Sequence, residues 1–497
     1  MANHRKKQQI ITNNKYMAKN NKPSKKKNSA LIGKIISIIQ LIVSIVFTVI
    51  LWMSGMMPEL YLAVLMVLLF MFFVITFDLQ FFRARAAHII GIIISLLIIA
   101  VLGIGSLYLW KATNMMKDVG GATYKTDNMI VVVKKEDTAQ TLMDARNYRF
   151  GSQTAVDQKN NQLMIENIEE NVSREINLEE FDTLVDMADA LLSGKVEAAI
   201  YNEAFTGIIE ESIEDYSDQV RILYQYGIDT EIEQEETSVE EPFNVYISGI
   251  DVSGPITTNS RSDVNIIMTV NPNTKKILLT TTPRDYYVPI PNVSGGARDK
   301  LTHAGIYGVD ASMATLESIY DIDISYYARV NFTSLVKIVD ALGGVDVNSE
   351  YAFTTSHGNY TIQKGINHMN GDVALGFSRE RYSFQDGDNQ RGKNQEAVLT
   401  AIIQKAMSPA ILTKASQIIS TVSDSVETNM TQDEMAKFIN MQLADGSSWS
   451  IESQAASGTG DNQMCFSSGS QLLYVMWPDE AVDEAISDKI KVIINDK

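Results

Sequence analysis

The 497-residue sequence contains one cysteine, Cys465, and only five histidines. A single cysteine cannot form an intramolecular disulfide, and it cannot build the cysteine clusters that hold structural zinc or iron–sulfur centres. Met464 and Phe466 flank Cys465, and no histidine lies near it in the sequence. We therefore expect Cys465 to be a buried apolar side chain rather than a catalytic nucleophile.

Acidic side chains are absent from residues 1–34, which carry ten lysines and arginines. Residues 35–112 add one further net positive charge. Because the whole chain has a net charge of −18, residues 113–497 carry −29. Nucleic-acid binding depends on cationic neutralisation of phosphates, so this large acidic segment argues against a nucleic-acid partner.

Three stretches contain no charged residue at all: Ile35–Met57, Leu60–Phe77 and Ile89–Trp110. As helices, each is long enough to cross a bilayer core of about 30 Å. The first stretch is too long for the apolar region of a signal peptide, and it leads directly into the second. The sequence thus predicts three transmembrane helices within residues 35–112.

The positions of the basic residues predict the orientation of these helices. The tail of residues 1–34 stays in the cytoplasm, and Arg83 and Arg85 lie in a short cytoplasmic loop. The three spans would anchor the chain in the cell membrane as a multi-pass protein. Everything after Ala112 would then lie outside the cell. The absence of cysteine pairs there fits a Gram-positive surface better than an oxidising secretory lumen.

The first exterior segment, residues 113–227, alternates predicted strands and helices. We expect a strand at 129–133, a helix from about Thr138, a strand and helix from Tyr148, a helix at Leu178–Leu192, and a turn, strand and turn at 194–205. This alternation predicts a small α/β accessory domain. It faintly resembles half of a solute-binding protein, but a plain spacer is the simpler interpretation. Residues 228–242 are acidic and poor in large apolar groups, as in a solvated linker.

After Pro242 the sequence contains apolar, β-branched runs at 243–250, 264–270 and 275–282. Such runs are typical of strands buried on both faces of a sheet. We further expect helices near 308–320, 334–342 and 391–405, a strand at 326–332, and late strands at 472–478 and 489–495. Together they predict an α/β/α sandwich with a central mixed sheet, its core within 243–410 and its C-terminal part or an extension within 411–497.

Charged side chains occur where these strands end. Asp251 follows the first strand, Arg261 and Asp263 immediately precede the second, and Arg284 follows the third. Farther along lie Arg379, Arg381, Arg391 and Gln395. Ligands of open α/β sheets favour the crevice beyond the strand ends, where aspartates can hold a hard cation and arginines can grip phosphate.

The alternative is that these residues form ordinary surface ion pairs, which contribute under about 1 kcal/mol each. The SRSD stretch alone would also suit a loop or a helix cap. Arg379 and Arg381 are two positions apart, as two solvated residues on one face of a short strand would be. The clustering of arginines in an otherwise acidic domain favours a binding site.

Several motifs resemble the LytR-CpsA-Psr (LCP) family of bacterial cell-envelope proteins. They are YISGID, SRSDVNIIMTVNP, LLTTTPRDYYV, DKLTHAGIYG, ARVNFTSLVKIVDALGGVDV and ALGFSRERYSFQDGDNQRGKNQEAVL, spread over residues 243–410. Three membrane spans and an accessory domain resemble the CpsA-like, capsule-associated branch. One departure is Phe377, where the family often has tyrosine.

The resemblance implies a phosphotransferase that moves a glycopolymer, in this branch a capsular polysaccharide, from undecaprenyl-pyrophosphate to peptidoglycan. It implies Asp251 and Asp263 as ligands of Mg²⁺, with Mn²⁺ as the alternative ion. By the same resemblance, the pyrophosphate head group is bound by Arg261, Arg284, Arg379, Arg381, Arg391 and Gln395. Asp263, Arg261 and Arg284 are the implied catalytic residues, and Asp263 is the first choice for the base. Capsule export or tyrosine-kinase machinery is a further implied partner.

Two other functions remain open. Family members have been described as transcriptional attenuators, which would make this chain an envelope or capsule regulator. The predicted topology leaves little of it in the cytoplasm for contact with DNA. Alternatively, water could replace the sugar hydroxyl, and the same residues would then hydrolyse a lipid pyrophosphate.

The topology can be tested with reporter fusions. A reporter fused after Arg85 should behave as cytoplasmic and one fused after Lys117 as external, because the basic loop stays inside and the third span crosses outward. Alkaline phosphatase and fluorescent-protein activities in cells measure this. An external Arg85 reporter would overturn the three-span topology and the exterior location of the site.

Overall fold

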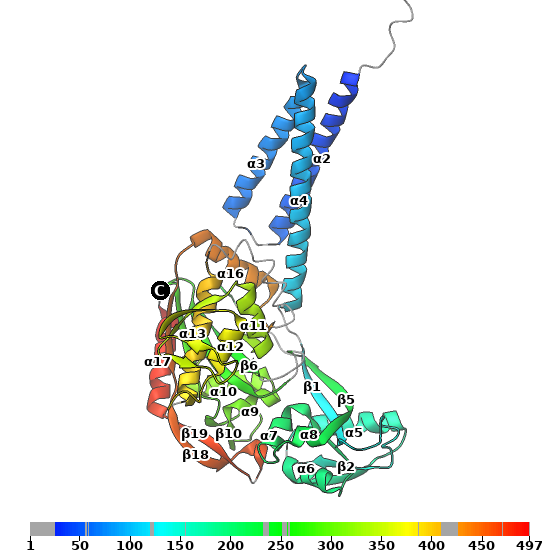
Figure 1. The fold of residues 1–497 in the computed structure, drawn as a ribbon, viewed down its shortest axis with the longest axis vertical. Coiled ribbons are helices and arrows are strands. Elements are labelled where there is room, and N and C mark those ends of the chain that lie inside the picture. The colour runs from blue at the N-terminus through cyan, green and yellow to red at the C-terminus, as the bar shows by residue number, and fades with distance from the viewer. Residues whose placement is uncertain are drawn as a thin grey trace, which may run out of the picture. The chain divides into compact units, whose positions relative to one another are not determined.

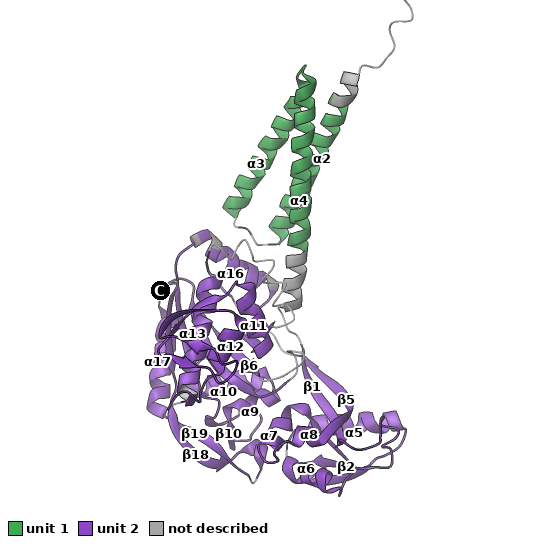
Figure 2. Ribbon diagram, viewed as in Figure 1, with its two compact units in different colours: residues 1–111 green, residues 112–497 purple. Residues whose placement is uncertain are grey.

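The structure is a computed structural model that describes residues 25–496 except 55–56, 58, 120–123, 155, 232–237, 251–255, 257–258, 386, 409–425 and 470. Most of the predicted basic tail, the middle of the predicted linker and the predicted ligand Asp251 lie outside the described residues. The chain divides into two compact units, residues 1–111 and 112–497 (Figure 2).

The first unit is built on three long helices, α2 (Lys25–Met53), α3 (Glu59–Asp78) and α4 (Arg85–Val119), with the short 3₁₀ turn η1 (Leu79–Phe81) between the last two. Their apolar spans cover Ala30–Met53, Glu59–Phe81 and Arg85–Trp110. Each span exposes many large apolar side chains, as expected of helices that face lipid. The three predicted helices are thus confirmed, while their orientation stays a prediction.

Polar side chains lie between these helices. The Thr76 hydroxyl donates to Gln40 Oε1 at 2.9 Å, and the Ser37 and Ser95 hydroxyls lie 3.5 Å apart. All four residues are buried. Polar contacts of this kind help membrane helices to associate, because the helices gain little from burying apolar surface in lipid.

The second unit begins with a five-stranded sheet, ordered β3-β2-β4-β1-β5. Its strands are β1 (Tyr124–Lys134), β2 (Arg149–Gln153), β3 (Asn177–Phe181), β4 (Ala198–Asn202) and β5 (Val220–Glu231). Successive residues of β1 pack into two different apolar cores, with Ile130 and Val132 in one and Met129 and Val131 in the other. The helices are α5 (Gln158–Val172), α6 (Leu184–Ser193), α7 (Thr206–Glu210) and α8 (Tyr216–Gln219), with the 3₁₀ turn η2 (Glu203–Phe205). We call this part of the chain the accessory domain.

Two predicted helices of the accessory domain are wrong. The segment from Thr138 forms turns, because the Asp144 carboxylate accepts the backbone N–H groups of Gln140 and Thr141 at 3.0 and 2.9 Å and competes with helical hydrogen bonds. The predicted helix at Leu178–Leu192 is instead β3 followed by α6. Thr183 separates the two elements, since its side chain caps the start of α6.

The larger sheet has the order β16-β11-β6-β7-β8-β17. Its strands are β16 (Val426–Thr428), β11 (Tyr326–Asn331), β6 (Phe243–Ile250), β7 (Ser262–Asn271), β8 (Lys276–Thr281) and β17 (Ser450–Ala455). β11 is parallel to β6 and β17 to β8, whereas β7 is antiparallel to both of its neighbours. The start of β7 therefore lies at the same edge as the ends of β6, β8 and β11. We call it the carboxyl edge of the sheet.

Helices cover both faces of this sheet, which confirms the predicted α/β/α sandwich (Figure 1). On one face, Tyr246, Ile267 and Leu278 pack against α10 (Val309–Tyr320) and α17 (Glu480–Asn495). On the other face, Val245 and Leu279 share a core with side chains of α13 (Gly387–Ala406) and α16 (Gln432–Asp445). The strand runs that the sequence predicted are buried on both faces.

The remaining elements surround this sandwich. The helices are α9 (Leu301–Ala304), η3 (Gly305–Tyr307), α11 (Phe332–Ala341), α12 (Gly371–Arg379) and η4 (Phe466–Ser468). The strands are β9 (Tyr287–Pro289), β10 (Arg298–Lys300), β12 (Val345–Ser349), β13 (Phe353–Thr354), β14 (Thr361–Ile362), β15 (Gly365–Met369), β18 (Gly458–Met464) and β19 (Leu472–Pro478).

The two late strands turn out differently from the prediction. The strand at 472–478 exists as β19, but it pairs with β18 in a separate two-stranded sheet and does not complete the central sheet. Residues 489–495 are helical in α17. Ile486, Ile490 and Ile493 recur with helical spacing and are buried, a pattern that a short apolar window alone does not distinguish from a strand. At the predicted linker, β5 continues to Glu231, so residues 228–231 are strand.

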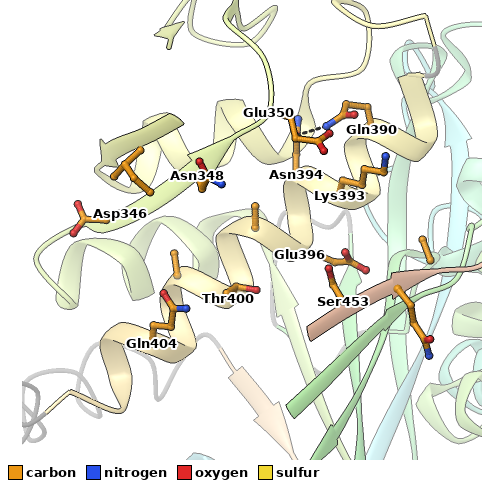
Figure 3. A pocket seen from close by; sticks show the side chains of 15 residues that line it. Asp346, Asn348, Glu350, Gln390, Lys393, Asn394, Glu396, Thr400, Gln404 and Ser453 are labelled. Carbon is orange, nitrogen blue, oxygen red and sulfur yellow. Dashed lines mark hydrogen bonds between the residues drawn. The ribbon is translucent and has the colours of Figure 1, made fainter. Parts of the chain in front are cut away.

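A buried carboxyl group connects α13 to the central sheet. The Thr281 hydroxyl at the end of β8 donates to Glu396 Oε1 at 2.6 Å, and Glu396 is 4% exposed. Both Glu396 and Ser453 line a polar cavity of about 650 Å³ between α13, β12 and β17 (Figure 3). Burial raises the pKa of Glu396 from 4.5 to about 7, although hydrogen bonds from Thr281 and Ser453 favour the ionised form.

The raised pKa of Glu396 predicts a pH dependence of stability. Between about pH 4.5 and 7 the folded protein holds more protons on this group than the unfolded chain does, so stability falls as the pH rises through this range. Glu396→Gln cannot ionise and should reduce that slope by up to about 1.4 kcal/mol per pH unit. Melting temperatures from pH 4 to 8 measure it. Glu350→Gln, at an exposed position of the same cavity, is the control and should keep the wild-type profile. Parallel profiles for Glu396→Gln and wild type would contradict the assignment.

Candidate functional site

The predicted site residues converge on the carboxyl edge of the larger sheet. The sequence predicted Asp263 to lie just before its strand, but it is the second residue of β7. Arg284 follows the end of β8 at Thr281. Because β7 runs antiparallel to β8, the start of one strand and the end of the other bring these two side chains together.

Asp263 forms the centre of this group. Its Oδ1 accepts from Arg284 Nη1 at 3.0 Å and from the Thr302 hydroxyl at 3.2 Å. Burial opposes ionisation of Asp263, but the positive charges of Arg284, Arg261 and Arg391 outweigh that effect and hold the pKa of its carboxyl below the usual range. Asp263 is therefore an ionised carboxylate surrounded by guanidinium groups.

Arg379 and Arg381 lie at and just after the C-terminal end of α12, and not on the short strand that the alternative interpretation suggested. Arg379 is the last residue of α12, and Arg381 follows it by two positions. The Arg379 guanidinium lies 4.3 Å from the centre of the Phe332 ring. Arg381 lies 4.9 Å from the ring of Tyr382 and donates to its hydroxyl at 3.0 Å. Contacts with aromatic rings orient planar guanidinium groups.

Helix α13 contributes Arg391 and Gln395, which lie four residues apart and so on the same face of the helix. Together with Asp263, Arg379 and Arg381 they line one cavity of about 400 Å³, which we call the arginine cavity. Its lining residues are Asp263, Val264, Phe332, Ser356, His357, Arg379, Arg381, Tyr382, Arg391 and Gln395.

Two predicted head-group residues are placed beside the arginine cavity rather than in its lining. Arg284 reaches it through its hydrogen bond to Asp263, and its Nε lies 3.6 Å from Asp285 Oδ2. Arg261 Nη1 bonds Glu211 Oε1 of the accessory domain at 2.9 Å. The structure therefore gathers Asp263, Arg379, Arg381, Arg391 and Gln395 around one space and joins the other two arginines to them by electrostatic contacts.

The sequence analysis missed several residues that line the arginine cavity or contact its lining. Phe332 directly follows the end of β11, so its position at the carboxyl edge could have been found from the strand pattern. Ser356 and His357 come from the segment between the short strands β13 and β14, and no sequence signal pointed to them. Thr302 donates to Asp263 from α9, a helix that was not predicted.

Phe377, which stands where the family often has tyrosine, and Cys465, the single cysteine, are both buried. Phe377 stacks on Phe353 with ring centroids 5.7 Å apart and does not line the arginine cavity. The missing tyrosine hydroxyl therefore removes no contact in this cavity. Cys465 is 2% exposed, and burial raises the pKa of its thiol to about 12, which agrees with an apolar, unreactive role.

The described residues supply one of the two predicted magnesium ligands. Asp263 is ionised, and among the described residues its Oδ2 has no hydrogen-bond partner. No group of three or more His, Cys, Asp or Glu side chains able to hold a metal occurs in the described part of the chain. Carboxylate oxygen is the donor that Mg²⁺ prefers, and few protein ligands suffice where substrate phosphates complete its shell. Asp263 thus fits a magnesium ion that is shared with a phosphate ligand.

Two curated proteins that bear the same name resemble part of this chain in sequence. A Bacillus cereus protein named polyisoprenyl-teichoic acid–peptidoglycan teichoic acid transferase TagU is 37% identical over 204 residues, 41% of this chain and 65% of its own. An Enterococcus faecalis protein of the same name is 36% identical over 201 residues, 40% of this chain and 65% of its own. The chain therefore spans about 65% of the length of the curated relatives it matches.

Solved structures of similar proteins match as well. The crystal structure of Bacillus subtilis TagV is 25% identical and covers 52% of this chain and 98% of its own, with a TM-score of 0.45. A structure titled TagT bound to LI-WTA is 26% identical and covers 52% of this chain and 94% of its own, with a TM-score of 0.43.

The family profile covers the segment that contains the arginine cavity. The LytR_cpsA_psr family matches residues 211–480, which is more than half of the 497-residue chain. The matched segment begins within the accessory domain and includes every strand of the central sheet. The resemblance seen in the sequence motifs is confirmed, and this protein belongs to the LytR_cpsA_psr family.

Proposed function

We propose that this protein is a membrane-anchored, extracellular phosphotransferase that moves a polysaccharide from undecaprenyl-pyrophosphate to peptidoglycan. The observation that carries the proposal is the arginine cavity, in which Arg379, Arg381, Arg391 and Gln395 surround the ionised Asp263. Relatives named as polyisoprenyl-teichoic acid–peptidoglycan transferases support the same class of donor and acceptor. The resemblance to the CpsA-like branch favours a capsular polymer.

The proposed reaction is phosphoryl transfer. A hydroxyl oxygen of peptidoglycan attacks the phosphorus that carries the polymer, and the bond from that phosphorus to the bridging oxygen of the pyrophosphate breaks. A phosphodiester forms, undecaprenyl phosphate leaves, and the hydroxyl proton passes to a base. Catalysis of such reactions rests on positioning and charge stabilisation rather than on covalent chemistry of the protein.

The side chains of the cavity suit these tasks. Guanidinium groups bind two phosphate oxygens at once, and here aromatic rings hold Arg379 and Arg381 in orientation. They would stabilise negative charge that develops on the departing lipid phosphate. The lowered pKa of Asp263 makes its carboxylate a poor proton acceptor and a good cation ligand, which favours the metal role over that of the base.

Asp263, together with Asp251, would hold the proposed Mg²⁺. When bound, the ion neutralises charge on the phosphate oxygens. Among the described residues, Arg284 and Thr302 both bond Oδ1 of Asp263, which leaves Oδ2 available for such a ligand.

An assay of the purified full-length chain tests the function. Incubation with undecaprenyl-pyrophosphate-linked polysaccharide and peptidoglycan should attach the polymer covalently to the peptidoglycan. Arg379→Lys should weaken binding of the lipid donor by about 1–3 kcal/mol, because lysine lacks the planar fork that pairs with two phosphate oxygens. Arg298→Lys is a matched control, since Arg298 lies over Trp477 at 5.0 Å outside the cavity. Release of free polymer without attachment would indicate hydrolysis and contradict the transferase.

The metal role can be tested separately. Asp263→Asn keeps the size of the side chain and removes its charge, so Mg²⁺-dependent transfer should be lost. The melting temperature should fall as well, because the carboxylate no longer compensates the neighbouring guanidinium charges. Transfer rates are measured against Mg²⁺ concentration, with Asp346→Asn in the other, polar cavity as the control. Wild-type magnesium dependence in Asp263→Asn would show that Asp263 is not a ligand.

A further inference from the structure

The accessory domain contacts one of the predicted head-group residues directly. Glu211 follows α7, and its Oε1 lies 2.9 Å from Arg261 Nη1. Both side chains are about one-quarter exposed, so the attraction is partly screened by water. The pair therefore matters more for the position of the guanidinium than for the stability of the fold.

A glycine of the same helix leaves room for this guanidinium. A Cβ atom at Gly207 would lie 2.8 Å from Arg261 Cζ and 3.0 Å from its Nε and Nη2. A Cβ contact of 2.8 Å is essentially never seen in proteins, so any side chain at this position would displace the end of Arg261. Gly207 in α7 and Glu211 after it thus restrict where the Arg261 guanidinium can lie.

Further ion pairs connect Glu211 to Asp263. Glu211 Oε1 lies 3.8 Å from Lys300 Nζ, and Lys300 pairs with Asp285 at 2.9 Å. Asp285 in turn lies 3.6 Å from Arg284, which bonds Asp263 at 3.0 Å. Lys300 and Asp285 are each less than one-tenth exposed, so this part of the network is shielded from solvent and its charges interact strongly.

The segment before Arg261 is also attached to the accessory domain. Asn259 is 1% exposed and donates to Asp127 Oδ1 on β1 at 2.9 Å. Asn202 of β4 donates to the same oxygen at 3.3 Å. The accessory domain therefore holds both neighbours of Ser260. It binds Asn259 through Asp127 and Arg261 through Glu211.

We propose that the accessory domain forms part of the transferase site, with Gly207 and Glu211 as positioning residues that hold Arg261 at the carboxyl edge of the central sheet for the pyrophosphate head group. The inference rests on the proposed function. It gives the accessory domain a specific role in binding the donor, in place of a spacer. The carboxylate of Glu211 orients Arg261, and Gly207 provides the space that this orientation needs.

The test measures binding of undecaprenyl pyrophosphate in detergent micelles to the purified full-length chain. Gly207→Ala displaces the guanidinium and leaves every charge in place, whereas Glu211→Gln removes the charge and keeps a hydrogen-bond acceptor. Each should raise the dissociation constant about tenfold, with an unchanged melting temperature. Glu210→Gln is the matched control, because Glu210 precedes Glu211 directly and is exposed, and it should bind like wild type.

Three results would overturn the inference. Wild-type affinity in both Gly207→Ala and Glu211→Gln would show that Arg261 needs no help from the accessory domain. Wild-type affinity with a lowered melting temperature would show that the contacts only stabilise the fold. A wild-type chain that does not bind undecaprenyl pyrophosphate would overturn the proposed function as well, so failure of the inference alone is distinguishable.

Discussion

The arrangement of the site depends on the charge of Asp263. Guanidinium groups gathered at one edge of a sheet repel each other, and the repulsion is strong where water is largely excluded. An ionised carboxylate among Arg284, Arg261 and Arg391 compensates this repulsion, and the same positive charges keep it ionised despite its burial. The antiparallel course of β7 makes this possible, because it places the start of that strand beside the end of β8.

The surrounding structure holds the arginines in defined positions. Phe332 supports Arg379 and Tyr382 supports Arg381. Helix α13, which carries Arg391 and Gln395, is attached to the end of β8 by the bond between Thr281 and Glu396. Preorganised charge is what phosphoryl transfer requires, since a site that must rearrange its dipoles during the reaction stabilises the transition state less. The ion pairs from Glu211 to Arg284 extend this organisation into the accessory domain.

Errors in the sequence interpretation occurred where local patterns were ambiguous. Residues 489–495 have the composition of a strand, but Ile486, Ile490 and Ile493 point to one side of a helix that packs on the sheet. The segment from Thr138 has helix-compatible residues, yet the Asp144 carboxylate binds the backbone of the preceding turn. Packing on the sheet determined the conformation in the first case and local hydrogen bonds of a side chain did so in the second, and propensity alone revealed neither.

The sequence by itself determined the three apolar helices, the strands β6, β7, β8 and β11 of the central sheet and the set of charged residues at strand ends, but not the edge strands β16 and β17. These features follow from local composition and periodicity, because burial on both faces or in lipid requires continuous apolar runs. Only the tertiary structure decided which charges meet. Arg379, Arg381 and Arg391 are distant in sequence from Asp263, yet they converge with it, whereas Arg261, two residues from Asp263, pairs with Glu211. Such pairings depend on how strands and helices pack across long chain separations, which no local pattern encodes.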